Sequence, residues 1–361
     1  MLSTLPKLAD KAFVLGFFLP VLLAVLAILA LFGDVPEVRS FLAAQGEGDR
    51  LEKLFYFALI VWGLSILMLL INNVQYQILE GYRWPFSNLA TFKDAERSRF
   101  EKLNDRVIAL RKERKEANNT LPDDKEMELQ DLWIKLRDDF PTKEALLLPT
   151  RFGNAIQAFE NYSSDVYGAD SVTLWFHLAA VLPKPFQSLL DDARASVNCL
   201  VNLCFFSALI GLIAVVRLTW HFAQSVRLFP PGFDAQSLFS LSSICFIGAT
   251  ALAAIVMRLS YNLAIERIHT WGALVMAAFD CFLPSLAVKL GYRLPITGEK
   301  QREFWTIVSQ RVGFHIPLRP ENWIQAIAVE GDVGGGDESK AAAVDESDSE
   351  DTTKTEESAA D

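Results

Sequence analysis

Four long apolar runs constrain the fold of this chain more than any other feature. The runs cover residues 13–32, 54–71, 197–216 and 238–257, and none of them contains Asp, Glu, Lys, Arg or His. A helix of about 20 apolar residues crosses the hydrocarbon core of a bilayer, which is about 30 Å thick. The sequence therefore predicts an all-α integral membrane protein with four transmembrane helices.

The first run is expected to be a retained span rather than a cleaved signal peptide. It is longer than the apolar region of a signal peptide, and no convincing small-residue cleavage site follows it. Pro20 lies inside the run, and a proline removes one backbone donor and clashes with the preceding turn. We therefore expect a kink at Pro20.

The third and fourth runs carry polar residues. Asn198 and Asn202 lie one turn apart at the start of the third run, so they share one helix face. We expect them to form hydrogen bonds between helices near the membrane interface. The fourth run contains Ser243 among small residues, a composition that favours close helix packing. A pore-lining face is the alternative interpretation of this run.

The distribution of basic residues predicts the orientation. On the side that holds both termini and residues 73–194, the basic residues near the run ends are Lys7, Lys11, Arg83, Lys184, Arg194, Arg258 and Arg267. The opposite side carries Arg39, Arg50, Lys53, Arg217 and Arg227. Because cytoplasmic loops carry the excess of Lys and Arg, both termini and residues 73–194 are expected in the cytoplasm.

Residues 73–194 are predicted to form a cytoplasmic helical region that contains a hairpin, 95–140. Its first apolar stripe consists of Phe100, Leu103, Val107 and Leu110, and its second of Met127, Leu129, Leu132, Trp133, Leu136 and Phe140. Two such stripes joined by a short polar turn indicate a coiled-coil hairpin. The basic run 111–115 is interpreted as its solvated face, and contact with anionic lipid is the sharper alternative.

The third and fourth spans are expected to continue beyond the membrane as stalk helices. One apolar stripe starts near Pro185 and runs without interruption into the third span, and another leaves the fourth span and reaches Pro284. Residues 258–329 would comprise the second stalk and a short helix, 297–312, with Thr297 as the expected N-cap.

The formal net charge of −10 is located in the C-terminal tail. Residues 330–361 hold twelve acidic residues and two lysines, and their composition predicts disorder. The rest of the chain is close to neutral, which argues against a nucleic-acid binder. The four cysteines form no CxxC pair and are interpreted as small buried hydrophobic residues; they are Cys199, Cys204, Cys245 and Cys281.

A polar stretch after Pro149 holds the candidate partner-binding residues. Thr150 and Asp170 are expected to cap two helices. The candidates are Arg151, Asn154, Glu160, Tyr162, Tyr167 and Asp170. Their charged members could pair with each other or bind the charge of a partner. The alternative is that these side chains fix the turn through capping and local hydrogen bonds.

Motifs of this stretch resemble those of a group of uncharacterised bacterial membrane proteins. The resemblance covers roughly residues 148–290 and is carried by PTRFGN at 149–154, YGAD at 167–170, LW at 174–175, LLDDARAS at 189–196 and AAFD at 277–280. It implies a location in the bacterial inner membrane. It implies no activity.

Catalytic chemistry has little support in the sequence. Glu266 and His269 match one half of a carboxylate di-metal helix motif, but the chain offers no second half. Phosphate-loop, GxSxG, HExxH and GxGxxG motifs are absent. We therefore expect no metal site, no cofactor and no catalytic residue.

These observations favour a non-enzymatic, membrane-anchored scaffold, sensor or assembly component that acts through its cytoplasmic helical domain. Its expected partners are membrane lipid and either a second protein or further copies of itself, and not nucleic acid. A homo-oligomeric channel gated from the cytoplasmic side is the alternative, suggested by the hydroxylated fourth run. A membrane-bound hydrolase is a more distant alternative.

Overall fold

The computed structural model describes residues 10–42, 47–88, 90–228 and 241–318, and the ordered elements in these ranges are all helical. The acidic tail at 330–361 and the first residues of the fourth run lie outside the described residues. The chain divides into two compact units, Met1–Ser163 with Leu182–Cys281 and Ser164–Val181 with Phe282–Asp361. Residues 164–181 thus group with the C-terminal part of the chain.

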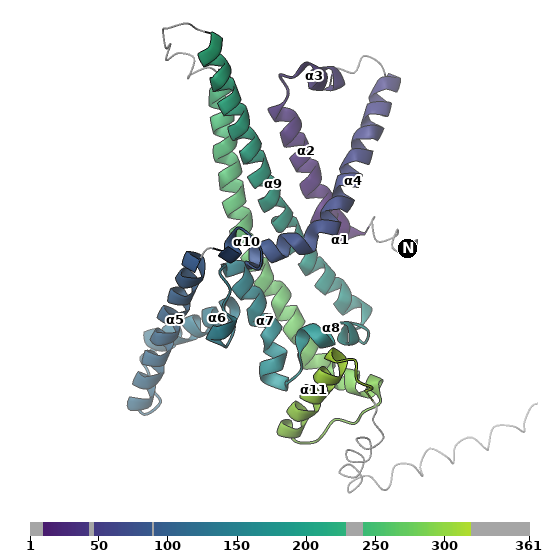
Figure 1. Ribbon diagram of the computed structural model, residues 1–361. Helices are drawn as coiled ribbons and strands as arrows, with labels where there is room; N and C mark the ends of the chain where they lie inside the picture. The colour runs from purple at the N-terminus through teal and green to yellow at the C-terminus, as the bar shows by residue number, and fades with distance from the viewer. Residues whose placement is uncertain (1–9, 43–46, 89, 229–240, 319–361) are drawn as a thin grey trace, which may run out of the picture. The chain divides into compact units, whose positions relative to one another are not determined.

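Four helical segments are long and apolar enough to cross a membrane (Figure 1). The first is continuous and consists of α1 (Lys11–Phe13), a π-turn (Val14–Phe18) and α2 (Leu19–Leu31). The other three are α4 (Glu47–Glu80), α9 (Lys184–Leu228) and α10 (Leu241–Leu290), and the short helix α3 (Pro36–Leu42) follows α2. The predicted helical fold with four candidate spans is confirmed at this level.

Two ion pairs connect α9 to the start of the first segment and to the turn that follows its end. Lys11 Nζ lies 2.7 Å from Asp192 Oδ2, and Arg217 Nη2 donates to Asp34 Oδ1 at 2.6 Å. The two segments therefore run in the same direction. From Asp192 to Arg217, α9 rises by about 38 Å at about 1.5 Å per residue, somewhat more than the roughly 30 Å of a bilayer core.

The disturbance expected at Pro20 takes the form of the π-turn that directly precedes it. Because Pro20 has no N–H, the carbonyl group of Gly16 lacks the donor that an α-helix supplies four residues later. Asn202 Nδ2 donates to this carbonyl oxygen at 2.8 Å. A side chain of α9 thus completes the backbone hydrogen bonding of the first segment.

The two helices that the sequence predicts as stalks, α9 and α10, are longer than expected. α9 is 45 residues long and α10 is 50 residues long. α10 passes through Pro284 to Leu290, so the expectation that its stripe ends at this proline is wrong. Leu283 and Leu286 are buried on either side of the proline, and this packing offsets the backbone hydrogen bond that the proline removes.

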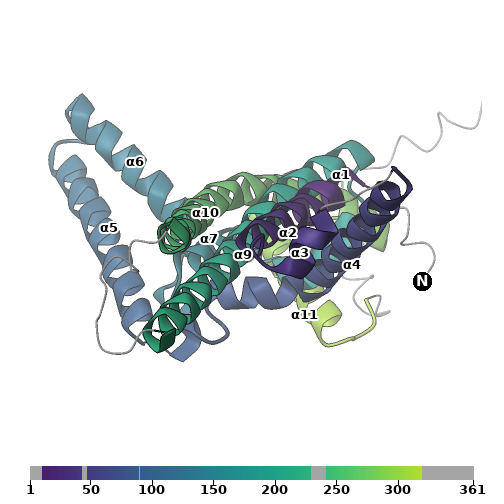
Figure 2. The ribbon, with the colours of Figure 1, turned by 90° about the horizontal axis from the view of Figure 1, so that it is seen from above.

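The predicted hairpin is present as α5 (Ala90–Glu116) and α6 (Asp123–Asp139), which lie side by side and are preceded by a 3₁₀ turn (Phe86–Asn88) (Figure 2). Its buried core is small and consists of Val107, Leu110 and Leu129. Asn118 and Asn119 have φ values of 54° and 65° in the connecting turn. Asn tolerates this left-handed region better than most residues, so the ANNT sequence suits a reversal of the chain.

A second 3₁₀ turn (Glu144–Leu146) leads into α7 (Arg151–Tyr167), whose start packs tightly against the end of α4. Thr150 Oγ1 accepts from the N–H of Gly153 at 3.0 Å and donates to the carbonyl of Leu79 at 2.6 Å. A Cβ at Gly153 would lie 2.4 Å from the carbonyl oxygen of Glu80. The first residues of the PTRFGN motif therefore join two helices.

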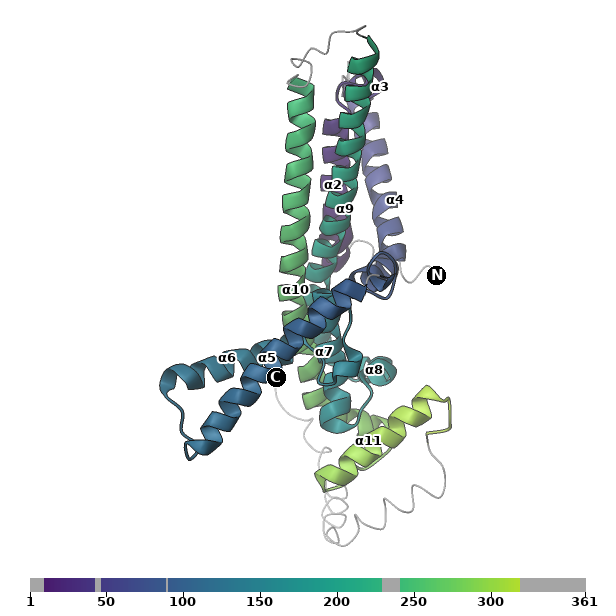
Figure 3. The same cartoon turned by 60° about the vertical axis from the view of Figure 1, so that its left-hand side comes forward.

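In the second unit, α8 (Ser171–Ala179) packs on α11 (Gly298–Gly313) (Figure 3). Gly168 has a φ of 73°, and a Cβ there would lie 2.5 Å from the carbonyl oxygen of Arg302. Asp170 caps α8 as predicted, because its side chain accepts from the N–H of Thr173 at 2.8 Å. Thr297 stands at the N-cap position of α11, but its side chain makes no capping hydrogen bond, which corrects the expected cap.

Candidate functional site

The sequence-predicted partner surface is divided between internal contacts and solvent. Arg151 is exposed. Asn154 is fully buried, where its side chain accepts from the N–H of Leu148 at 2.7 Å. Tyr162 donates to Asp280 at 2.8 Å, and Glu160 accepts from Gln157 at 3.2 Å. These contacts favour the capping and local bonding alternative for most of the stretch.

Tyr167 and Asp170 belong to the second unit, whereas the other four candidates belong to the first. Besides its capping role, Asp170 donates its backbone N–H to Ser309 Oγ of α11 at 2.9 Å. The YGAD motif therefore orders a turn between two helices. A partner-binding role for the six residues stays a prediction.

The membrane-packing candidates are all buried. Asn198 Oδ1 accepts from Tyr76 of α4 at 2.9 Å, and Asn202 Oδ1 accepts from Gln75 of α4 at 3.0 Å. The expected interhelical hydrogen bonds are therefore present. Ser243 is 5% exposed.

His269 contacts a carboxylate of the hairpin rather than a second metal-binding motif. Its Nε2 atom lies 3.1 Å from Asp139 Oδ1, which gives an ion pair when the imidazole is protonated. Among the described residues, no group of three or more His, Cys, Asp or Glu side chains is arranged to hold a metal ion. The contact instead connects the base of the hairpin to α10.

Charged side chains around Arg99 hold this base in place. The guanidinium of Arg99 pairs with Asp139 and lies 3.5 Å from Glu96, which also accepts from Asn154 at 3.2 Å. Burial raises the pKa of Glu96, and the charge of Arg99 only partly opposes it. Burial also raises the pKa of Asp139, but the contacts of His269 and Arg99 outweigh burial and lower that pKa overall.

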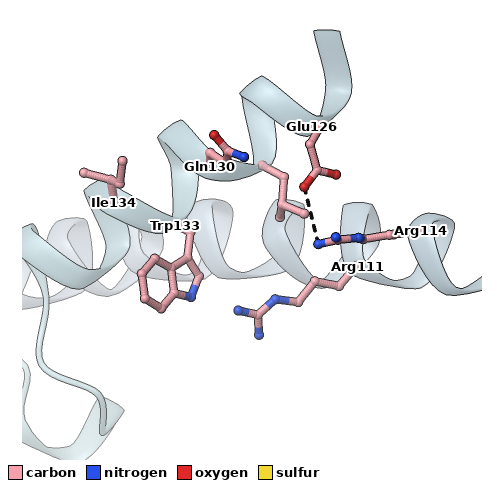
Figure 4. A pocket seen from close by; sticks show the side chains of 7 residues that line it. Arg111, Arg114, Glu126, Gln130, Trp133 and Ile134 are labelled. Atoms are coloured by element: carbon pink, nitrogen blue, oxygen red, sulfur yellow. Dashed lines mark ion pairs between the residues drawn. The ribbon is translucent and has the colours of Figure 1, made fainter. Parts of the chain in front are cut away.

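The two hairpin helices form a groove of about 420 Å³ on one face (Figure 4). This hairpin groove is lined by Arg111, Arg114, Glu126, Leu129, Gln130, Trp133 and Ile134. Trp133 and Ile134 are 44% and 45% exposed, although both are large apolar residues. The groove thus combines an open apolar surface with two guanidinium groups.

The two arginines of the groove differ in their partners. Arg114 lies 3.4 Å from Glu126 across the hairpin, as Figure 4 shows. Arg111 has no ion-pair or hydrogen-bond partner among the described residues, and its side chain extends beside Trp133. Arg137 lies 5.7 Å from the ring centroid of Trp133 and helps to fix the indole. A free cation therefore stands beside a positioned aromatic surface.

The sequence pattern alone does not predict this groove. Arg111 belongs to the basic run interpreted as a solvated face, and Trp133 belongs to the second apolar stripe of the hairpin. The sequence does carry one signal for an exposed apolar surface. The second stripe has more large apolar side chains than a hairpin of two helices can bury between its helices.

Comparisons of the chain with protein-family models, with curated proteins and with solved structures give no match.

Proposed function

We propose that the protein is a membrane-anchored docking protein, a scaffold or assembly component, whose hairpin groove binds an acidic amphipathic helix of a partner. One observation carries the proposal: Arg111 is free beside the half-exposed Trp133. Trp and Arg are the residue types that most often dominate the binding energy of interfaces.

The chemistry of the groove selects the kind of partner. An amphipathic helix binds a groove through apolar residues spaced by three and four positions. Trp133 and Ile134 offer the apolar contact for such residues. A carboxylate on the flank of the partner helix would pair with Arg111. Such a charge pair favours acidic partners over others and fixes the register in which the partner helix binds.

The proposed setting is the bacterial inner membrane, with both termini and the hairpin in the cytoplasm. The excess of basic residues supports this orientation, and the resemblance to bacterial membrane proteins supports the location. The ion pairs Lys11–Asp192 and Arg217–Asp34 agree with a membrane between them. An alkaline phosphatase fused within residues 229–240 should be active, and one fused at the hairpin turn, 117–122, should be inactive. The reverse result would overturn the orientation.

Purification at native level from the organism's own membrane tests the docking function. We expect the wild-type chain to carry a second protein in a fixed ratio and the double variant Arg111→Ala/Trp133→Ala to lose it. Truncating both anchors removes about 2 kcal/mol or more of binding energy, so the retained fraction should fall at least about tenfold.

Two single variants serve as controls. Lys112→Ala removes a neighbouring cation whose side chain is 77% exposed and only weakly paired with Glu116, and it should retain the companion. Arg151→Ala tests the surface predicted from the sequence and should also retain it. If the double variant keeps the companion while Arg151→Ala loses it, the binding surface lies on α7 and the hairpin proposal is wrong. A homo-oligomer without a companion would favour self-association instead.

A further inference from the structure

Four amide side chains form a buried cluster where α4, α9 and the π-turn meet. Asn72 Nδ2 donates to Asn198 Oδ1 at 3.3 Å, and Gln75 Nε2 donates to Asn202 Oδ1 at 3.0 Å. Asn202 continues the sequence of bonds by donating to Gly16. These residues are nearly inaccessible to solvent: Asn72, Gln75, Asn198 and Asn202 are 8%, 4%, 7% and 0% exposed.

Two acceptors of this cluster lack donors. Asn72 Oδ1 and Gln75 Oε1 are enclosed, and no described residue donates a hydrogen bond to either. Rotating the Gln75 amide by half a turn would not help, because its oxygen would then face Asn202 Oδ1, and Asn202 is held in this orientation by its bond to Gly16. Leaving a buried acceptor unsatisfied costs about 1–3 kcal/mol, so in these orientations both atoms favour a donor from outside the chain.

The required occupant is small, neutral and a donor of hydrogen bonds. The cluster itself contains no carboxylate. A cation there would have no negative partner in an environment of low dielectric constant, and burying an unpaired charge is costly. Asn72 and Gln75 are three residues apart on α4, so their side chains share one face with Cβ atoms about 5–6 Å apart. A water molecule supplies two donors at this spacing, and buried water commonly satisfies such groups.

We propose that this amide cluster is a water-binding site that fills from the C-terminal end of α4. Tyr82 and Trp84, a few residues beyond the cluster, are exposed at this end. Water bound to Asn72 and Gln75 completes the hydrogen bonding of the two helices. The same water would lie beside the π-turn, near the start of the first apolar segment.

The water ends at the amide cluster and does not continue as a pore. Ser65, two turns further along α4, donates to the carbonyl of Val61 of its own helix at 2.6 Å. Thr250 on α10 likewise donates to the carbonyl of Phe246 at 2.8 Å. Both hydroxyl groups already donate to carbonyl groups of their own helices, so they do not need water as a hydrogen-bond acceptor. A row of water molecules beyond the amide cluster is therefore not expected.

Water-edited solid-state NMR of the full chain in lipid bilayers tests the site. With ¹⁵N-labelled Gln and Val, the side-chain amide of Gln75 should receive magnetisation from water nearly as fast as that of Gln130 in the open hairpin groove. The backbone amide of Val61, which is fully buried, is the dry reference. Gln75→Met identifies the signal, and Gln75→Glu makes the same assignment if the first variant does not fold. Build-up at Gln75 as slow as at Val61 would overturn the proposal.

The same sample distinguishes water from a bound ion. The Gln75 signal should keep its chemical shift when sodium chloride is replaced by potassium chloride or choline chloride at equal ionic strength. A shift that follows the identity of the small cation would show a cation site and would contradict a water site.

Discussion

Asn202 supplies the hydrogen bond that Pro20 takes away from Gly16. The proline leaves the Gly16 carbonyl without its helical donor, and Asn202 Nδ2 lies 2.8 Å from that oxygen. The relationship links a helix-breaking residue of the first segment to a polar residue of α9. It also gives this asparagine a structural role in a largely apolar stretch.

Asn202→Leu should destabilise the protein by about 1–3 kcal/mol for each polar group left unpaired, namely the Gly16 carbonyl and the Gln75 amide. Thermal unfolding in mild detergent measures this loss. In a Pro20→Ala background the new N–H can satisfy Gly16, so Asn202→Leu should cost less there. Additive effects, within about 0.5 kcal/mol, would show that the two residues are not coupled.

Gly153→Ala should be strongly destabilising, because the added Cβ would lie 2.4 Å from the backbone oxygen of Glu80. Backbone cannot move as cheaply as a flexible side chain, and overpacking of this kind costs about 1–3 kcal/mol. The melting temperature of the purified protein reports the effect. Gly63→Ala is the matched control on α4, since no heavy atom lies within 4 Å of its added Cβ. Equal melting temperatures for the two variants would refute this close approach of α7 and α4.

Asp139 should make the attachment of the hairpin sensitive to acid. Its pKa is lowered in the folded protein, since Arg99 and His269 outweigh the effect of burial. A lowered pKa contributes stability that is present above the ordinary value, about 3.9, and is lost as the pH falls through the folded value. Glu96 acts in the opposite direction, because its raised pKa favours the folded state at low pH and loses this contribution as the pH rises.

Melting temperatures between about pH 7 and pH 3 separate these contributions. Asp139→Asn should be less stable than wild type at neutral pH, with a flatter decline on acidification. Asp138→Asn, which removes the neighbouring carboxylate that pairs with Arg137, should keep the wild-type decline. An unchanged slope in Asp139→Asn would mean that this carboxylate does not hold the hairpin.

The elements that depend on local pattern could be predicted from the sequence. Apolar length alone predicted the four long helices, and two apolar stripes predicted the hairpin. The cap at Asp170 is predictable from the sequence because its hydrogen bond is local, from the N–H of Thr173 three residues later. The continuation of α10 through Pro284 was missed, since burial on both sides of the proline depends on distant segments.

Contacts between distant residues could not be predicted in this way. Periodicity indicates that Asn198 and Asn202 share a face, but not that Asn72 and Gln75 face them. The pairing of the hairpin arginines depends on the antiparallel register of its helices, so Arg114 and Arg111 look alike in sequence although only the first contacts Glu126. Gly153 likewise gives no sign of the helix that excludes a side chain there.

Site-specific photo-crosslinking in living cells tests the docking function most directly. A benzoylphenylalanine at Gln130, which lines the hairpin groove, should crosslink to one protein through an acidic amphipathic helix that mass spectrometry can identify. The crosslink should disappear when Arg111→Glu is added, and a probe at Lys112 should give little of it. Crosslinks only to lipid or to a second copy, or an equal yield with Arg111→Glu, would contradict a partner-docking role for the hairpin groove.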